Sequence, residues 1–232
     1  MRHVTFLRPN LGIGPPHDAM APLVFAILKG LTPTHIETHL IDERVDPFVP
    51  VDTDLVAVAR SLQPGTALDL GCGAGQNCIW LAERGWRVLG VDIAGSAIRS
   101  AEAAAREADV SAHFERDDLT SWNTDDHFDL VVSTYALPPR GRGRTHTLTV
   151  ARDAVAPGGV ALVAEFEVSL AGSGWMAEDH LVTLEEITDM FPGFHLDRAE
   201  VVVAAHGHGE ETRRLPIAIV VARHPGPSSD GS

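Results

Sequence analysis

A glycine-rich turn between two regular elements constrains this chain more than any other feature. Residues 67–77, ALDLGCGAGQN, pass from an apolar stretch through three alternating glycines into a helical pattern. Glycines at 71, 73 and 75 let the backbone turn sharply and approach a ligand, while the following helix directs free N–H groups at it. We therefore predict a strand, a ligand-binding turn and a helix, with a nucleotide-like cofactor at the turn.

The glycine spacing favours one class of cofactor over another. A dinucleotide-binding turn needs glycine or alanine at the last position of G-x-G-x-x-G, and this chain has Gln76 there. Asp92 ends the short apolar run 87–92, about twenty residues beyond Gly71, which is the distance expected for an acid that binds ribose hydroxyls. NAD is retained only as an alternative.

Further elements follow Asp92 in an alternating order. Residues 110–114 are expected to form a strand before the acidic pair Asp117-Asp118, and FDLVVST at 128–134 a buried strand. The later elements expected are a helix at 145–156, a turn at Gly158-Gly159, a strand at 160–166, a helix at 184–190 and an antiparallel strand pair at 194–205 and 212–223. This alternation predicts an α/β fold.

Taken in order, these motifs resemble those of the class I S-adenosylmethionine-dependent methyltransferases. The shared features are DLGCGAG at 69–75, the acidic end of the second strand, Asp118-Leu119 and the FDLVVS strand. The wording around the turn, with WLA at 80–82 and Gly85-Trp86, is most similar to the small-molecule group that includes tellurite-resistance methyltransferases. The resemblance covers roughly residues 60–223.

The resemblance implies a Rossmann-like, doubly wound, mostly parallel sheet with a C-terminal antiparallel strand pair, and bound S-adenosylmethionine. It assigns Asp69 and the glycine backbone to the methionine end, Asp92 to the ribose, and Asp118 with the Leu119 amide to the adenine. The residues expected to bind the cofactor are Asp69, Gly71, Cys72, Gly73, Gly75, Asn77, Asp92, Ile93, Asp117, Asp118, Leu119 and Ser133.

The predicted catalytic residues are Tyr135, Glu165 and His146. Methyl transfer from a sulfonium is an in-line displacement, so alignment supplies much of the catalysis, and a base is needed only when the acceptor holds its proton. Tyr135, the only tyrosine, is expected to contact the substrate, with plain packing as the alternative. Glu165 and Glu167 would share one strand face, unless they are exposed edge acids. His146 and His180 are candidate bases, with surface or packing roles as alternatives.

No metal site is predicted. The turn HGHGEE at 206–211 offers nitrogen and oxygen ligands, but a polar turn flanked by glycines accounts for the same residues. No second cluster of ligands accompanies it in the sequence.

Charge and composition limit the partners. A net charge of −14 argues against a nucleic-acid partner, and the Gly-Arg run at 140–144 is interpreted as a mobile charged loop. Two cysteines do not make a secreted disulfide framework. No signal pattern is found, and the longest apolar run, 22–28, is shorter than the ~20 residues of a membrane helix. We expect a cytoplasmic protein with a small-molecule substrate and no membrane partner, and a homodimer is left open.

Three segments are expected along the chain. Residues 1–50 form an accessory βαβ segment, residues 51–224 the methyltransferase domain, and residues 225–232 a disordered tail. The domain is expected to begin with a helix at 52–62, although this run also suits an extra strand.

The accessory segment has its own resemblance. Residues 6–12, FLRPNLG, and 40–43, LIDE, resemble the opening of the cobalamin-binding domains that precede radical-SAM enzymes. The Asp-x-His-x-x-Gly and Cys-x-x-x-Cys-x-x-Cys signatures of that group are absent from the sequence. We therefore expect a shape without that cofactor chemistry.

The function predicted is transfer of a methyl group from S-adenosylmethionine to an O, N or S atom of a small molecule. One alternative is a protein that binds S-adenosylmethionine without turnover, in a regulatory or assembly role. Others are an enzyme that uses the same cofactor for another reaction and an NAD-dependent oxidoreductase.

Overall fold

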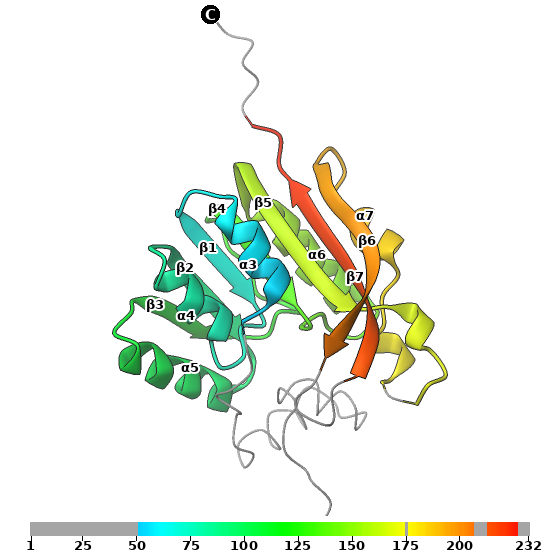
Figure 1. The fold of residues 1–232 in the computed structure, drawn as a ribbon, viewed down its shortest axis with the longest axis horizontal. Coiled ribbons are helices and arrows are strands. Elements are labelled where there is room, and N and C mark those ends of the chain that lie inside the picture. Colours follow the sequence, from blue (N-terminus) through cyan, green and yellow to red (C-terminus); the bar gives the residue numbers. More distant parts are fainter. Residues whose placement is uncertain (1–50, 175, 207–212, 227–232) are drawn as a thin grey trace, which may run out of the picture.

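A computed structural model describes residues 51–174, 176–206 and 213–226 (Figure 1). The strands are β1 (Thr66–Leu70), β2 (Arg87–Asp92), β3 (Ala112–Arg116), β4 (Phe128–Thr134), β5 (Val155–Phe166), β6 (His195–His206) and β7 (Arg213–Arg223). The helices are α3 (Thr53–Arg60), α4 (Gln76–Ala82), α5 (Gly95–Glu107), α6 (Arg142–Asp153) and α7 (Leu184–Thr188), with 3-10 turns η1 (Val168–Leu170) and η2 (Glu178–His180).

The described strands form one seven-stranded sheet in the order β3-β2-β1-β4-β5-β7-β6. Strands β1 to β5 pair in parallel, and β7 pairs antiparallel with both β5 and β6. The predicted fold, a doubly wound and mostly parallel sheet that ends in an antiparallel pair, is confirmed. The predicted βαβ segment at 1–50 lies outside the described residues.

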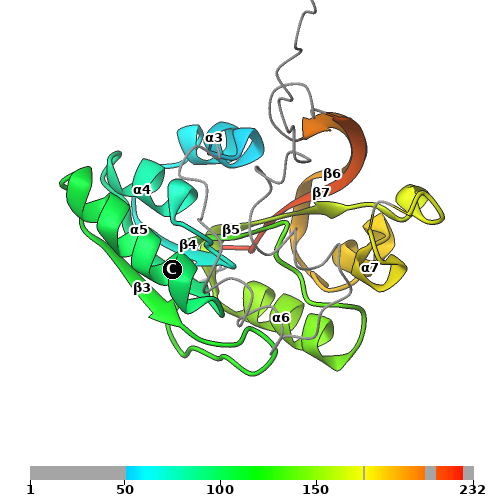
Figure 2. The same ribbon diagram turned by 90° about the horizontal axis from the view of Figure 1, so that it is seen from below.

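Helices cover both faces of the sheet (Figures 1 and 2). Successive strand residues point to opposite faces, so Leu130 and Val132 of β4 pack in one apolar cluster with Leu55 of α3, while Val131 packs in a second cluster with Leu148 of α6. Helices α3, α4 and α5 contribute to the first cluster, and α6 and α7 to the second. The sheet is therefore buried on both faces, as parallel sheets require.

Several element boundaries differ from the predictions. Strand β3 begins two residues later than expected, α6 begins three residues earlier, and α7 ends at Thr188. The expected turn at Gly158-Gly159 is wrong, because both glycines lie within β5, where its register against β4 is irregular. Gly158 has φ +82, and a Cβ on Gly159 would lie 3.0 Å from the Asp129 carbonyl oxygen. The glycines thus allow an irregular strand pairing rather than ending the strand.

The described residues include the predicted helix at 52–62 but little of the predicted C-terminal tail. The run at 52–62 is confirmed as helical, since α3 spans most of it. Most of the predicted tail lies outside the described residues. Among the helices that the structure describes, none is long and apolar enough to cross a lipid bilayer.

Candidate cofactor and acceptor site

The predicted site residues gather at one edge of the sheet, where the parallel strands end. Strand β1 lies between β2 and β4, so the chain turns in opposite directions on the two sides of β1. In open α/β sheets, ligands bind in the crevice at such a point, outside the carboxyl ends of the strands. The glycine turn follows β1 directly and therefore lies at this crevice.

The three glycines of the turn have different roles. Their φ angles are +80, +53 and +83, which only glycine adopts at low cost. A Cβ on Gly71 would lie 2.1 Å from the Ala136 Cβ, and one on Gly75 would lie 2.8 Å from the Ala101 Cβ. A Cβ on Gly73 would meet nothing within 4 Å. Gly71 and Gly75 are thus required by packing, whereas Gly73 faces open space.

Asp92 joins the turn to the next helix. One carboxylate oxygen of Asp92 accepts a hydrogen bond from the Gly73 amide at 2.9 Å, and the other accepts one from the Ala94 amide at 2.8 Å. The side chain is buried, and this burial raises its pKa above the usual value for an aspartate. The carboxylate predicted from its distance to Gly71 therefore does lie against the glycine turn.

The acidic loop after β3 is tied to the same edge. The Asp117 amide donates to the Asp92 carbonyl at 3.1 Å, and the Asp118 carboxylate accepts from the Thr120 amide at 2.9 Å. The Leu119 carbonyl accepts from the Thr147 hydroxyl of α6 at 3.0 Å. Ile93 is half-buried next to Asp92. The structure thus brings Ile93, Asp117, Asp118 and Leu119 together beside the end of β2.

Asp69 lies beneath the turn. The side chain is almost completely buried, and burial raises its pKa to about 7. The Cys78 thiol donates to the Asp69 carboxylate at 3.4 Å, and the negative charge of Asp92 raises the pKa further. Cys72 is buried in the same core cluster as Cys78. Asp69 is therefore only partly ionised near neutral pH.

Ser133 of β4 is also buried, and its hydroxyl has no hydrogen-bond partner. Buried polar atoms of this kind are rare, because an unmade hydrogen bond costs about 1–3 kcal/mol. The hydroxyl is one of three buried side-chain polar atoms without a partner in the described part of the chain, with those of Ser96 and His180.

Asn77 links the turn to α3. Its side-chain oxygen accepts from the Asp52 amide at 3.0 Å, and its side-chain nitrogen lies 3.4 Å from the Thr134 hydroxyl. The Asp52 carboxylate in turn accepts from the Asp54 and Leu55 amides and so caps α3. Sequence reasoning missed Asp52, although Asp before a helical run is a typical N-cap signal.

Tyr135 follows β4 in an uncommon backbone conformation, with φ +56. Its ring lies 5.0 Å from the ring of Phe166, centroid to centroid. Burial, and then the negative charges of Asp52 and Glu165, raise the pKa of the phenol above its usual value. The phenol therefore keeps its proton at neutral pH, where it can donate a hydrogen bond but cannot act as a base.

Glu165 and Glu167 have different environments. Glu165 is buried, and its carboxylate accepts from the Phe166 amide at 2.9 Å and the Leu137 amide at 3.2 Å. Burial raises the pKa of Glu165 to about 7. The Glu167 carboxylate instead accepts from the Ser169 amide at 2.8 Å. The two carboxylates thus differ in their hydrogen-bond partners, and their action as a pair stays a prediction.

The two candidate histidines occupy different segments. His146 lies on α6, and its Nε2 is 2.9 Å from the Trp122 carbonyl oxygen in the loop between β3 and β4. His180 ends the turn η2 and is buried, with no partner for Nδ1. Burial lowers the pKa of His180.

The Gly-Arg run is not a mobile charged loop, which corrects that prediction. Arg144 lies on α6 and is one of the largest fully buried side chains. Its guanidinium donates to the carbonyls of Pro138 at 2.7 Å and Leu181 at 3.0 Å, and lies 3.2 Å from a Glu186 carboxylate oxygen. A charge this deeply buried needs such partners, and the sequence contains no local sign of them.

Known proteins share part of this chain. Residues 67–159 match the family model of a methyltransferase domain. Ribosomal RNA small subunit methyltransferase C of Alcanivorax borkumensis is 34% identical over 105 residues, which are 42% of this chain and 31% of the relative. Ribosomal protein L11 methyltransferase of Thermus thermophilus is 36% identical over 116 residues, which are 47% of this chain and 42% of the relative.

Solved structures agree on the fold. TehB of Haemophilus influenzae has a TM-score of 0.67 at 18% identity, over 75% of this chain and 62% of that chain. Residues 67–159 are thus similar to a methyltransferase domain. The chain spans less than half the length of either curated relative.

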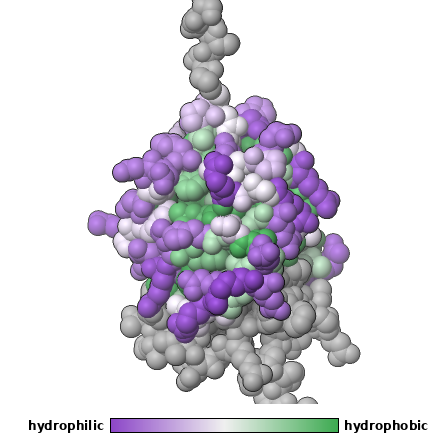
Figure 3. Space-filling view, turned by 90° about the vertical axis from the view of Figure 1, so that its left-hand side faces the viewer, coloured by the Kyte–Doolittle hydropathy of each residue, from purple (hydrophilic) through white to green (hydrophobic). Residues whose placement is uncertain are grey.

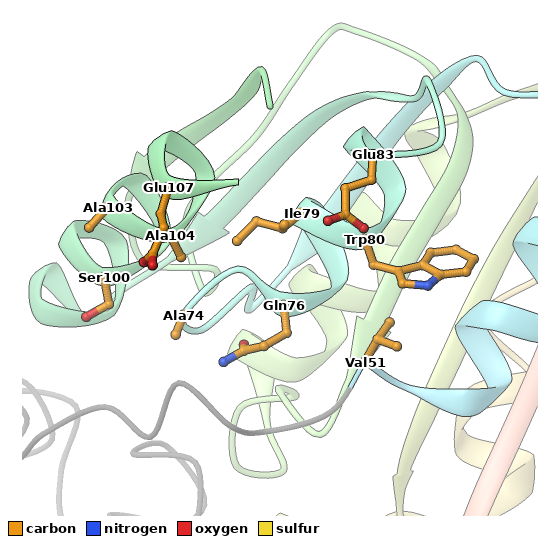
Figure 4. A pocket seen from close by; sticks show the side chains of 10 residues that line it. All are labelled: Val51, Ala74, Gln76, Ile79, Trp80, Glu83, Ser100, Ala103, Ala104 and Glu107. Carbon is orange, nitrogen blue, oxygen red and sulfur yellow. The ribbon is translucent and has the colours of Figure 1, made fainter. Parts of the chain in front are cut away.

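A groove also lies beside the glycine turn, on the surface of α4 and α5 (Figure 4). The groove has a volume of about 590 Å³ and is lined by Val51, Ala74, Gln76, Ile79, Trp80, Glu83, Ser100, Ala103, Ala104 and Glu107. Figure 3 shows the side of the molecule on which α5 and β3 lie, where apolar surface is bordered by polar residues. Asp92, Asp118 and Ser133 do not line the groove, whereas Ala74 and Gln76 at the glycine turn do.

Proposed function

We propose that this protein is an S-adenosylmethionine-dependent methyltransferase that acts on an O, N or S atom of a small molecule, and that residues 51–224 form its domain. The observation that carries the proposal is the contact between the Asp92 carboxylate and the Gly73 amide at the crevice beside β1. This contact unites the two motifs on which the cofactor assignment depends.

The residues at the crevice fit the cofactor. Space is open beside Gly73, the buried Ser133 hydroxyl has no partner, and each Asp92 oxygen has a further lone pair for a ribose hydroxyl. Asp92 would hold the ribose, Asp118 and Leu119 the adenine side, and Asp69 with the turn the methionine end. The remaining members of the proposed set are Gly71, Cys72, Gly75, Asn77, Ile93 and Asp117.

When bound, S-adenosylmethionine supplies a methyl carbon activated by a positively charged sulfur. The residues of the chain would then bind and align the acceptor, which can supply much of the rate enhancement of a displacement reaction. The buried Phe166 ring packs against Tyr135, and Glu165 holds the backbone of the segment that follows Tyr135. In this proposal Tyr135 contacts the acceptor, and Glu165 positions Tyr135.

A small-molecule acceptor is favoured by the net charge of −14, since binding to a phosphate backbone requires a positive surface. The names of the two curated relatives refer to ribosomal RNA and to a ribosomal protein. Both macromolecules therefore belong in the acceptor test. We propose the tellurite-resistance-like subgroup, because the sequence around the glycine turn resembles that group.

Calorimetric titration with S-adenosylhomocysteine tests the cofactor site. We expect Asp92→Asn to weaken binding by about 10- to 100-fold, because hydrogen bonds to charged groups contribute roughly 1.5–3 kcal/mol. Asp126→Asn changes an exposed carboxylate outside the site and is the matched control. Unchanged affinity in the Asp92 variant would place the cofactor elsewhere.

Turnover is tested by measuring S-adenosylhomocysteine formation with phenols, amines, thiols, a ribosomal RNA fragment and a ribosomal protein. We expect product with at least one small molecule and none with the two macromolecules. Cofactor binding without product from any acceptor would support the binding-only alternative. NAD binding without affinity for S-adenosylmethionine would support the oxidoreductase alternative.

A further inference from the structure

The turn η2 contains a buried imidazole to which the preceding proposal gives no role. The His180 side chain is 8% exposed, and its Nδ1 has no hydrogen-bond partner. Most buried side-chain polar atoms are hydrogen-bonded, and leaving one unbonded costs about 1–3 kcal/mol. A catalytic role is one recognised reason for a folded protein to keep such a nitrogen without a partner.

The backbone on both sides of His180 is held firmly. The Asp179 carbonyl accepts from the Arg140 amide at 2.6 Å and from the Arg144 guanidinium at 2.5 Å. The Leu181 carbonyl accepts from the same guanidinium at 3.0 Å. Because Arg144 also binds the Pro138 carbonyl, η2 is held against the segment between β4 and α6.

A second set of contacts places η2 beside the end of β5. The Val182 amide donates to the Phe166 carbonyl at 3.0 Å, and the Val182 carbonyl accepts from the Val168 amide at 2.8 Å. The Phe166 ring lies against Tyr135, which directly follows β4. His180 is therefore placed between the segments that follow β4 and β5, at the carboxyl edge where an acceptor is expected.

The charges around His180 favour a neutral ring. Burial lowers the pKa of the imidazole, the Asp179 carboxylate opposes this, and the Arg144 guanidinium adds to it. Glu186 lies 3.2 Å from Arg144 and partly balances that charge, and Arg140 joins the cluster through its bond to Leu181. At neutral pH the ring therefore has a lone pair available.

We propose that His180 is a catalytic residue whose imidazole contacts the methyl acceptor and takes its proton during transfer. The inference rests on the proposed methyltransferase function and narrows the acceptor to a group that holds its proton at neutral pH, such as a phenol, a thiol or an ammonium. The acceptor atom forms its bond to the methyl carbon as the carbon–sulfur bond breaks, and that electron pair stays on sulfur. The acceptor's proton passes to Nδ1 of His180.

The kinetic test compares His180→Gln with His127→Gln in the full chain, using the phenol, thiol or amine probe that supports turnover. We expect His180→Gln to lower kcat/KM by about 10²- to 10⁴-fold, the usual contribution of a general base. His127, which is exposed directly before β4, is the matched control and should keep kcat/KM within about threefold. S-adenosylhomocysteine affinity should be the same in both variants.

The pH profile separates a base from a structural residue. In the wild type, kcat/KM should fall as the pH drops through the lowered pKa of His180, because the protonated ring cannot accept a proton. Asp69 and Glu165 titrate at about 7 and can add to the same limb. The limb of the pH profile that is lost in His180→Gln and kept in His127→Gln belongs to His180. Added imidazole should restore part of the activity of His180→Ala.

A further measurement needs neither turnover nor a variant. It therefore tests the inference even if His180→Gln fails to fold or no probe gives product. In histidine-labelled wild-type protein bound to S-adenosylhomocysteine, the assigned His180 ring signals should shift when the phenol, thiol or amine probes are added. The inference would be overturned if the His180 ring signals do not shift with any probe. It would also be overturned if His180→Gln has an unchanged kcat/KM and pH profile. Failure of the wild type to bind S-adenosylhomocysteine would instead overturn the proposed function.

Discussion

Burial, more than ion pairing, determines the acid–base behaviour of the carboxylates at the carboxyl edge of the sheet. Desolvation is the largest cause of the raised pKa values of Asp69, Asp92 and Glu165. The carboxylates of Asp92 and Glu165 each accept two backbone N–H bonds, which hold the glycine turn and the Tyr135 segment in place. These carboxylates therefore hold the local backbone in place, and the free-energy cost of burying their charge depends on pH.

We expect Glu165 to make the protein less stable as the pH rises. The pKa of Glu165 is about 7 in the folded protein, compared with 4.5 for an exposed glutamate. The native state thus binds this proton more tightly, so the contribution to stability is fully present below pH 4.5 and is lost as the pH rises through about 7. The difference corresponds to about 3 kcal/mol.

Urea denaturation at about pH 5 and pH 8 measures this effect. In Glu165→Gln the change in unfolding free energy between the two pH values should shrink by about 3 kcal/mol. Glu167→Gln, which changes a partly exposed carboxylate two residues away, should leave the change as in the wild type. An equal change in all three proteins would mean that Glu165 does not titrate in this range.

At the scale of elements, polar contacts join α3 and η2 to neighbouring parts of the fold. Helix α3 is joined to Asn77 through the Asp52 amide, and to β6 through the ion pair between Asp54 and Arg198. The turn η2 is joined to α6 through Arg144. These contacts connect segments that are far apart in the sequence, so the site depends on elements outside its motifs.

We expect the Asp52 cap to stabilise α3. Its carboxylate accepts from the Asp54 amide at 2.8 Å and from the Leu55 amide at 2.9 Å. Asp52→Ala should lower the unfolding free energy by about 1 kcal/mol, the usual effect of losing an N-cap. Asp52→Asn keeps a capping oxygen and should lie close to the wild type. Equal losses in the two variants would show that the charge of Asp52, not the cap, stabilises the helix.

At the scale of the whole molecule, the negative charge limits which macromolecules can approach. We expect no binding of a ribosomal RNA fragment at about 10 µM protein and about 0.15 M salt, because few positive side chains are available to displace counterions from phosphates. A gel-shift titration measures this, with S-adenosylhomocysteine binding as the check for folded protein. A salt-dependent shift would favour an RNA acceptor, as in the name of one curated relative.

The motifs could be predicted because they depend on short stretches of chain. The positions of β2 and β4 follow from apolar runs that the structure places at the same residues. The glycine turn and Asp92 follow from a spacing that the sheet brings into contact. The family model of a methyltransferase domain matches residues 67–159, which contain these motifs. Boundaries near Gly158 could not be predicted, because an irregular strand and a turn use the same residues.

The sequence alone determined the α/β fold and the location of the cofactor motifs, since apolar periodicity and glycine spacing act within a few residues. Only the tertiary structure decided which polar groups are buried. In the sequence, Arg144 is part of a charged run, and Glu165 is one of two acids on a predicted strand. In the structure, both side chains are buried by segments from elsewhere in the chain. Burial and the resulting pKa shifts arise from long-range packing, which local sequence does not encode.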